Sequence, residues 1–197
     1  MSSVFLSPSD QVANTYAFGD TNEAVVCQQI CNLLKDKLNN FGVLVVSEPN
    51  MYKAVSRSNK MRPDLHLAIH TNASAGHNVR GVRVFYYPGS EYGKTFAEHF
   101  FRSLSGLFKG SHAMKQNSKL YELRKTVSPA VYLELDFHDS VDGAKWLIGS
   151  KELIADTLCS VICDIFNIRS SGLPVVDSKS FTFCCPHCGK KMEVVKK

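Results

Sequence analysis

The sequence has no apolar run that approaches the ~18 residues of a membrane-spanning helix. Its first residues, MSSVFLSP, also lack the basic segment and the long apolar segment of an export signal. We therefore expect a protein without a membrane span that is made in the cytoplasm without a signal peptide. The chain contains no internal repeat and no low-complexity tract.

Cysteines are few and odd in number: the chain has seven, so a closed disulfide framework is not expected. Four of them form two pairs spaced four residues apart in helix-like apolar stretches, where we expect small buried thiols. These are Cys27 with Cys31 and Cys159 with Cys163. The other three lie together near the C-terminus. A reducing cytoplasm at synthesis suits both groups.

Positive and negative charges nearly balance over most of the chain. The net charge is +5, but residues 169–197 hold six Lys and Arg against two Asp and Glu, which leaves +1 for residues 1–168. The basic tail suits an anionic partner such as a wall polymer or nucleic acid, and solubility alone explains it equally well. We expect no nucleic-acid partner.

With 197 residues, of which 44% are hydrophobic, the chain can bury a full-sized core. Short apolar runs alternate with helix-period segments. The runs expected as strands are 4–6, 43–46, 65–69, 81–87 and 130–135, and the helical segments are 22–38, 92–107 and 144–168. This alternation predicts an α/β fold, a doubly wound and mostly parallel sheet flanked by helices. In such folds, functional sites gather beyond the carboxyl ends of the strands.

The segment RSSGLPVVDSKS after Ile168 is polar and contains Gly and Pro, as linkers do. We expect one domain over residues 1–168, a linker over 169–180 and a Cys-rich tail over 181–197. Within the domain, Gly42 is expected to turn the chain from the first helix into the next strand.

Two histidines stand four residues apart in the run LHLAIHTNA, residues 65–73. The run is short and bounded by polar residues, so a buried strand is expected. On a strand, His66 and His70 share a face but lie ~13 Å apart, from a rise of about 3.3 Å per residue. They cannot both bind one ion at zinc–nitrogen distances of about 2.0–2.1 Å. His70, at the carboxyl end, is the functional candidate, and His66 is expected to be a core histidine.

Other polar side chains fall at the ends of expected strands or at the start of the first helix. They are Asp10, Glu23, Glu134 and His138. Each has a structural alternative: Asp10 could cap a turn, Glu23 could complement the positive end of its helix, and Glu134 could form a buried ion pair. Their joint position at one edge of the sheet favours a functional site.

The segments PDLHLAIHTNAS, RGVRVFYYPGSEYGKTFAEHF and KLYELRKTVSPAVYLELDFHD resemble, in order and spacing, the core motifs of the zinc-dependent N-acetylmuramoyl-L-alanine amidases. This doubly wound α/β family is often found in phage endolysins and autolysins. The resemblance runs from about Val4 to Ile168. It implies hydrolysis of the peptidoglycan amide between muramic acid and L-alanine, with Zn²⁺ lowering the pKa of its bound water to about 7.

Residue by residue, His70 resembles a zinc ligand of the family, Glu23 its acidic ligand and Glu134 its catalytic glutamate, which acts as general base. The family usually has a histidine in a Pro-Gly-His-Gly turn after its first strand, and this chain has Asp10 there. Three residues could replace that third ligand: Asp10, His138 or His66. We predict His138, because imidazole is a common zinc ligand and Asp139-Ser140 suggests a turn there.

In the tail, Cys185-Pro-His-Cys188 has the CxxC spacing of half a zinc ribbon. A tetrahedral site needs four ligands, and the chain has no second CxxC. Cys184 or His187 could join, a second copy of the chain could complete the site as a homodimer, or the CxxC could stay metal-free. We predict a structural zinc on Cys184, Cys185 and Cys188.

Two functions remain open on the sequence alone. The first is a peptidoglycan hydrolase that reaches the cell wall after holin-mediated release or lysis. The second is a catalytically impaired amidase fold that binds wall fragments or a partner. An intact Glu134 favours the enzyme, and the missing turn histidine favours the binding module.

Overall fold

The computed structural model describes residues 1–168 and two strands of the tail, β7 (Ser180–Cys184) and β8 (Lys191–Val195), which pair antiparallel. The side chain of Cys184 and the whole of Cys185, His187 and Cys188 lie outside the described residues. The zinc site of the tail therefore stays a prediction. Within the described part of the chain, no helix has the length and apolar character needed to cross a bilayer.

The centre of the domain is a six-stranded sheet with the order β2-β1-β3-β6-β4-β5. Its strands are β1 (Ser3–Pro8), β2 (Leu44–Ser47), β3 (Leu65–Asn72), β4 (Arg83–Tyr86), β5 (Ala113–Gln116) and β6 (Ala130–Phe137). All neighbouring pairs are parallel except β4 with β6, which is antiparallel. The predicted α/β class with a mostly parallel sheet is confirmed.

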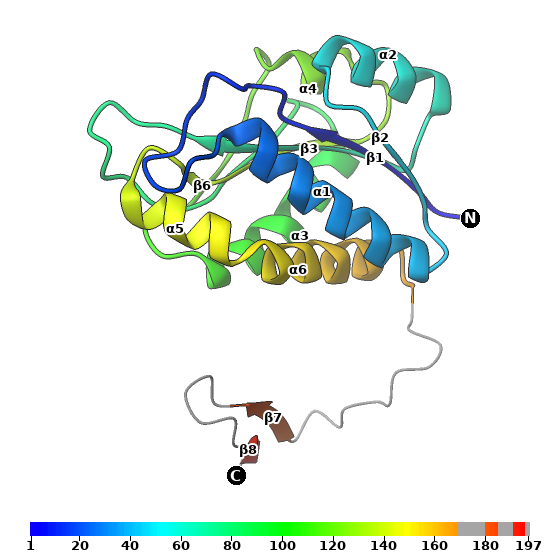
Figure 1. Ribbon diagram of the computed structural model, residues 1–197. Helices are drawn as coiled ribbons and strands as arrows, with labels where there is room; N and C mark the ends of the chain where they lie inside the picture. Colours follow the sequence, from blue (N-terminus) through cyan, green and yellow to red (C-terminus); the bar gives the residue numbers. More distant parts are fainter. Residues whose placement is uncertain (169–179, 185–190, 196–197) are drawn as a thin grey trace.

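Six helices cover the two faces of this sheet. They are α1 (Glu23–Asn40), α2 (Met51–Met61), α3 (Glu91–Leu107), α4 (Tyr121–Lys125), α5 (Val141–Gly149) and α6 (Lys151–Ile165). Figure 1 shows α2 and α4 on one side of the sheet and α3, α5 and α6 on the other, with α1 packed along α6. Burial on both faces explains the nearly continuous apolar runs of the central strands.

The main core lies between the sheet and the layer of α1, α3 and α6. Leu6, Ile30, Leu67, Phe100 and Leu133 are among its fully buried side chains. A smaller cluster on the opposite face joins Ala68, Leu123, Ala130 and Tyr132 beneath α4. This second cluster is smaller than the first.

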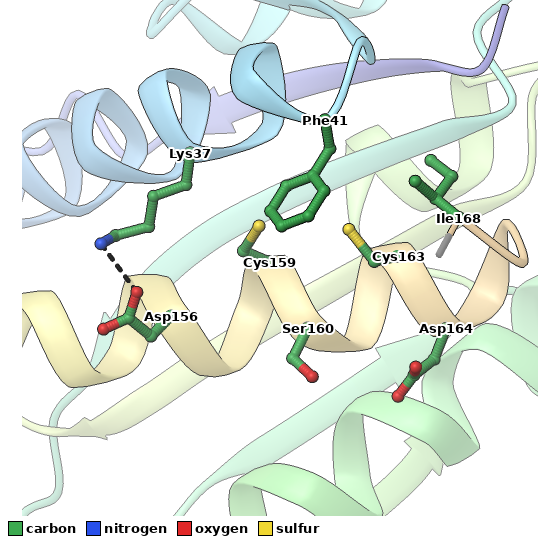
Figure 2. Close-up of a pocket in the computed structure, with 8 residues that line it drawn as sticks. All are labelled: Lys37, Phe41, Asp156, Cys159, Ser160, Cys163, Asp164 and Ile168. Carbon is green, nitrogen blue, oxygen red and sulfur yellow. Dashed lines mark ion pairs between the residues drawn. The ribbon is translucent and has the colours of Figure 1, made fainter. Parts of the chain in front are cut away.

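The four cysteines of the domain are free and buried, as expected. Cys27 and Cys31 lie in α1, and Cys159 and Cys163 lie in α6. Figure 2 shows the last two beneath Phe41, in a pocket between α1 and α6. Burial raises the pKa of Cys159 to about 12, so its thiol stays protonated. These thiols therefore act as small core side chains.

The segment 144–168, expected as one helix, contains two. Helix α5 ends at Gly149, and Ser150 serves as the boundary residue of both α5 and α6. Serine competes for backbone hydrogen bonds and favours helix ends over helix interiors, which accounts for the break. The Gly42 turn is observed with a φ of 71° between α1 and β2. Strands β3 and β6 each run two or three residues beyond the predicted ends.

Gly143 in α5 lies against the carbonyl of Phe137, at the end of β6. A Cβ at Gly143 would be 2.1 Å from that oxygen. We expect Gly143→Ala to destabilise the protein by about 1–3 kcal/mol, since the backbone must shift to relieve the overlap. Urea denaturation measures the effect. Gly149→Ala is the control in the same helix, because its Cβ would meet nothing within 4 Å. Equal stability of the two variants would contradict this packing.

Candidate active site

Polar side chains gather where β1, β3 and β6 end at one edge of the sheet. His70 of β3 and Glu134 of β6 are directly paired across the two parallel strands. Because parallel partners point to the same face, both side chains stand on the α2–α4 side of the sheet. The amino end of α1 brings Glu23 to the same edge, with Asn22 capping the helix through the backbone N–H of Val25.

Glu23 and His70 form a buried pair at the centre of this group. Glu23 Oε1 lies 2.9 Å from His70 Nδ1 and also accepts the backbone N–H of Thr71. Glu23 Oε2 accepts a 2.7 Å hydrogen bond from Asn14. The Glu23 side chain is only 1% exposed and that of His70 12%. The two expected ligands therefore meet through one carboxylate oxygen and one ring nitrogen.

The other ring nitrogen of His70 faces a carboxylate that the sequence analysis missed. Glu122 Oε2 lies 3.8 Å from His70 Nε2, and Glu122 Oε1 lies 3.1 Å from His66 Nε2. His66 Nδ1 lies 3.0 Å from the Ser58 hydroxyl. His66 is fully buried with both nitrogens partnered, as expected of a core histidine. His66 and His70 thus share a glutamate between them.

The charges of this group are strongly coupled. Burial lowers the pKa of His70, but Glu122 and Glu23 outweigh it and raise that pKa to about 9. Burial raises the pKa of Glu122, but His66 and His70 outweigh it and hold that pKa at about 2. Without a metal ion, the imidazolium form of His70 between two carboxylates is therefore favoured at neutral pH.

Glu134 has the opposite shift. Burial raises its pKa to about 7, and the nearby charge of Glu23 adds to the rise, while His70 and Arg83 oppose it. Its Oε2 accepts a short hydrogen bond from the side-chain amide of Asn72. A carboxyl with a pKa near the working pH is suited to general acid–base chemistry.

His138 lies directly after β6, which runs to Phe137 instead of ending near Leu135 as predicted. Asp136 has a φ of 96° and lies within a register shift between Glu134 and Phe137, so the strand is irregular just before His138. His138 Nδ1 lies 2.9 Å from Thr71 Oγ1 and 4.0 Å from Glu23 Oε2. Burial lowers its pKa, which favours the neutral ring that a metal ligand requires.

Asp10 is exposed, and its Oδ2 lies 3.4 Å from the side-chain amide of Asn50. With His70 and Glu122 it lines a pocket of about 170 Å³ at the end of β1. Asp10 thus shares a pocket with His70, whereas His138 lies 4.0 Å from Glu23.

Carboxylate oxygens and imidazole nitrogens are common zinc ligands, and the site contains both. Two of these atoms already lie close together. Two ligands of one tetrahedral zinc lie roughly 3.3–3.5 Å apart, so Glu23 Oε1 and His70 Nδ1, which are 2.9 Å apart, would separate slightly to admit the ion. Within residues 1–168, however, no three His, Cys, Asp or Glu side chains converge tightly enough to hold an ion. His138 faces the second oxygen of Glu23, so a third ligand requires a side chain to move.

No local sequence signal identified Glu122. It lies in KLYELRKT among lysines and an arginine, in a five-residue helix, where a charged residue is normally solvated. Only the packing of α4 on the sheet buries its carboxylate.

Comparison with known proteins places this geometry in a family. Residues 9–164 match the family model described as N-acetylmuramoyl-L-alanine amidase, Amidase_3. An uncharacterized 38.4 kDa protein of Clostridium perfringens is 28% identical over 155 residues, which are 73% of this chain and 45% of that protein. The chain therefore spans less than half the length of this curated relative.

Solved structures share the fold. The catalytic domain of the amidase CwlV from Bacillus (Paenibacillus) polymyxa var. colistinus has a TM-score of 0.76 at 16% identity, over 86% of this chain and 100% of that one. An N-acetylmuramoyl-L-alanine amidase of Clostridium difficile 630 has a TM-score of 0.76 at 18% identity, covering 87% and 98%. The catalytic domain of the CD27L endolysin targeting Clostridia difficile has a TM-score of 0.69 at 23% identity, covering 85% and 98%. At these identities the likeness concerns the fold.

Proposed function

Because the chain belongs to the N-acetylmuramoyl-L-alanine amidase family, we propose that it hydrolyses the amide bond between N-acetylmuramic acid and L-alanine in peptidoglycan. The observation that carries this proposal is the placement of Glu134. Its carboxyl, with a pKa raised to about 7, is paired across the strands with His70, which contacts Glu23. A proton acceptor thus stands beside a group of metal-ligating side chains at the carboxyl edge of the sheet.

In this proposal, Glu23, His70 and His138 would hold zinc. When bound, the ion would supply a Lewis acid that polarises the scissile carbonyl and makes water a stronger acid. Glu23 contributes its Oε1 and His70 its Nδ1, the two atoms already in contact. His138 Nδ1 lies 4.0 Å from Glu23 Oε2 and contacts Thr71, so His138 would have to turn away from Thr71 to join them.

Glu134 moves the protons. As a carboxylate it accepts a proton from the attacking water at an Oε atom, and as a carboxylic acid it passes that proton to the departing amine of L-alanine. The amide of Asn72 donates to Glu134 Oε2 and so fixes the orientation of the carboxyl group. Burial raises the pKa of Glu134 to about 7. Near neutral pH the carboxyl can therefore both accept the proton from water and donate it to the amine.

One observation favours the second function, a catalytically impaired amidase fold that binds wall fragments. Carboxylates face both ring nitrogens of His70, which stabilises a protonated ring that binds no metal. The usual turn histidine is also replaced by Asp10. A protein of this kind would bind peptidoglycan without releasing products.

Zinc content and product analysis separate the two functions. We expect the purified full-length chain, dialysed against zinc, to clear purified cell walls and to release new N-terminal L-alanine. Zinc is quantified by mass spectrometry in the full chain and in the Cys185→Ser/Cys188→Ser variant, so that metal in the tail is subtracted. Wall binding without new L-alanine termini would establish the binding module instead.

The remaining proposals concern the tail and the route to the wall. We propose that Cys184, Cys185 and Cys188 bind a structural zinc and that a second copy of the chain can share it. Release by a holin or by lysis, as for an endolysin, remains the proposed path to peptidoglycan.

A further inference from the structure

Glu122 is a buried carboxylate that the proposed chemistry does not use. It is 1% exposed, lies in a helix of five residues, and stands on the side of the His70 ring opposite Glu23. Its two oxygens face two different histidines, His66 at 3.1 Å and His70 at 3.8 Å. An acidic side chain is almost never fully buried unless it is paired, and the two partners of Glu122 are these histidines.

We propose that Glu122 is a positioning residue: it holds the His70 ring in the orientation that presents Nδ1 to Glu23 and to a metal ion. The inference rests on the proposed zinc site and adds a residue that the ligand set does not include. In this arrangement the proton of His70 stays on Nε2 and points at Glu122. A ligating histidine commonly donates its other N–H to such a carboxylate, which fixes the tautomer and the ring.

Stacking contacts fix the plane of the His70 ring, but they do not determine which of its two flipped orientations it adopts. Tyr132 stacks on the ring with centroids 4.5 Å apart and an angle of 15°. Stacking defines the plane, but a half-turn about the Cβ–Cγ bond keeps that plane and exchanges Nδ1 for a carbon. Only polar partners distinguish the two orientations. Glu23 and the side-chain amide of Gln11 at Nδ1, together with Glu122 at Nε2, favour the observed orientation.

Glu122 is itself held by a chain of buried contacts. If His66 accepts the Ser58 hydroxyl proton at Nδ1, its Nε2–H donates to Glu122 Oε1. Phe5 stacks on His66 at 5.5 Å with an angle of 5°, so this ring is also confined to one plane. The chain Ser58–His66–Glu122–His70 therefore runs through the core to the site. The second oxygen of Glu122 is left to face His70.

The test uses Glu122→Leu and Glu122→Gln in the full chain, each combined with Cys185→Ser/Cys188→Ser and compared with that tail variant alone, so that zinc in the tail does not enter the measurement. Leucine removes the acceptor, and glutamine keeps an amide oxygen that can face His70 Nε2. We expect zinc affinity, measured by competition with a chromogenic chelator, to fall by about 10–100-fold in Glu122→Leu and by less in Glu122→Gln. Glu48→Gln is the control, because Glu48 pairs with Arg57 and makes no contact with His70.

The second readout is the ¹⁵N spectrum of His70, with and without zinc. We expect zinc on Nδ1 and a proton on Nε2 in the wild type, and two ring orientations in Glu122→Leu. Unchanged affinity and an unchanged spectrum in both variants would overturn the proposal, as would zinc on Nε2, which would make Glu122 a ligand. If the wild type binds no zinc, the proposed hydrolase fails, while the zinc-free spectra still show whether Glu122 orients the ring.

Discussion

Glu134→Gln is expected to lower the rate of wall hydrolysis by about 10²–10⁴-fold, the range contributed by a positioned general base. Glutamine has nearly the same shape and retains a contact with Asn72, but it cannot accept the proton of the attacking water. Zinc content and peptidoglycan binding should stay close to wild type, because Glu134 lies beside the ligands and is not one of them. Release of L-alanine termini from purified walls measures the rate.

Without zinc, Glu134→Gln should also be more stable than the wild type. Burial raises the pKa of Glu134 from 4.5 to about 7 in the folded state. A carboxyl shifted upward stabilises the fold fully below pH 4.5 and loses that contribution as the pH rises through 7. Glu134→Gln should therefore raise the Tm at pH 8, with a gain that shrinks toward pH 5. Wild-type activity in Glu134→Gln, or a lower Tm at pH 8, would contradict the assigned role.

His70→Ala is expected to destabilise the zinc-free protein by about 3–5 kcal/mol, the usual cost of removing one partner from a buried ion pair. The substitution leaves Glu23 and Glu122 as two buried carboxylates without the cation between them. The pKa of His70 is raised to about 9, so its contribution is complete below pH 6.5 and is lost as the pH rises through 9. Urea denaturation at pH 6 and pH 9.5 should show the larger cost at pH 6.

His77→Ala provides the matched control for His70→Ala. Its Nδ1 lies 2.9 Å from Asp139 Oδ2, the same distance as in the His70 pair, but its side chain is 72% exposed. Solvent screens such a pair, so only a small change is expected at either pH. His70→Ala should also remove zinc from the domain and abolish wall clearing, whereas His77→Ala should keep the zinc. Equal effects of the two variants on stability and zinc content would contradict the proposed role of His70 as a buried, zinc-binding histidine.

The parts of the fold that local patterns describe were predicted well. The run 65–69 is apolar, short and bounded by polar residues, and it is a strand with His70 at its carboxyl end. Asn22 and Glu23 open α1 as expected, because a capping side chain and an acidic first turn act on neighbouring backbone groups. The break at Ser150 and the helices α2 and α4 escaped prediction. Helix α2 is mostly polar and buries only three residues, and α4 has only five residues, so neither has the apolar run that marks a helix in the sequence.

The sequence predicted which residues belong to the candidate site better than it predicted the contacts between them. Glu23, His70, Glu134 and His138 do gather at one edge of the sheet, because parallel strands bring their carboxyl ends together. The sequence could not show that His138 faces the second oxygen of Glu23. That contact depends on the irregular strand end at Asp136, a residue with positive φ that no pattern of apolar residues reveals.

The sequence by itself determined the fold class, the strand that carries His70 and the set of residues at the carboxyl edge, because spacing and local backbone preference act over a few positions. Only the tertiary structure decided that Glu122 is buried and faces both His66 and His70. Burial of a charged side chain depends on what packs over it from distant parts of the chain. The pKa values of Glu134 and His70 follow from the same packing, since they are set by burial and by partners more than 45 residues away in the chain.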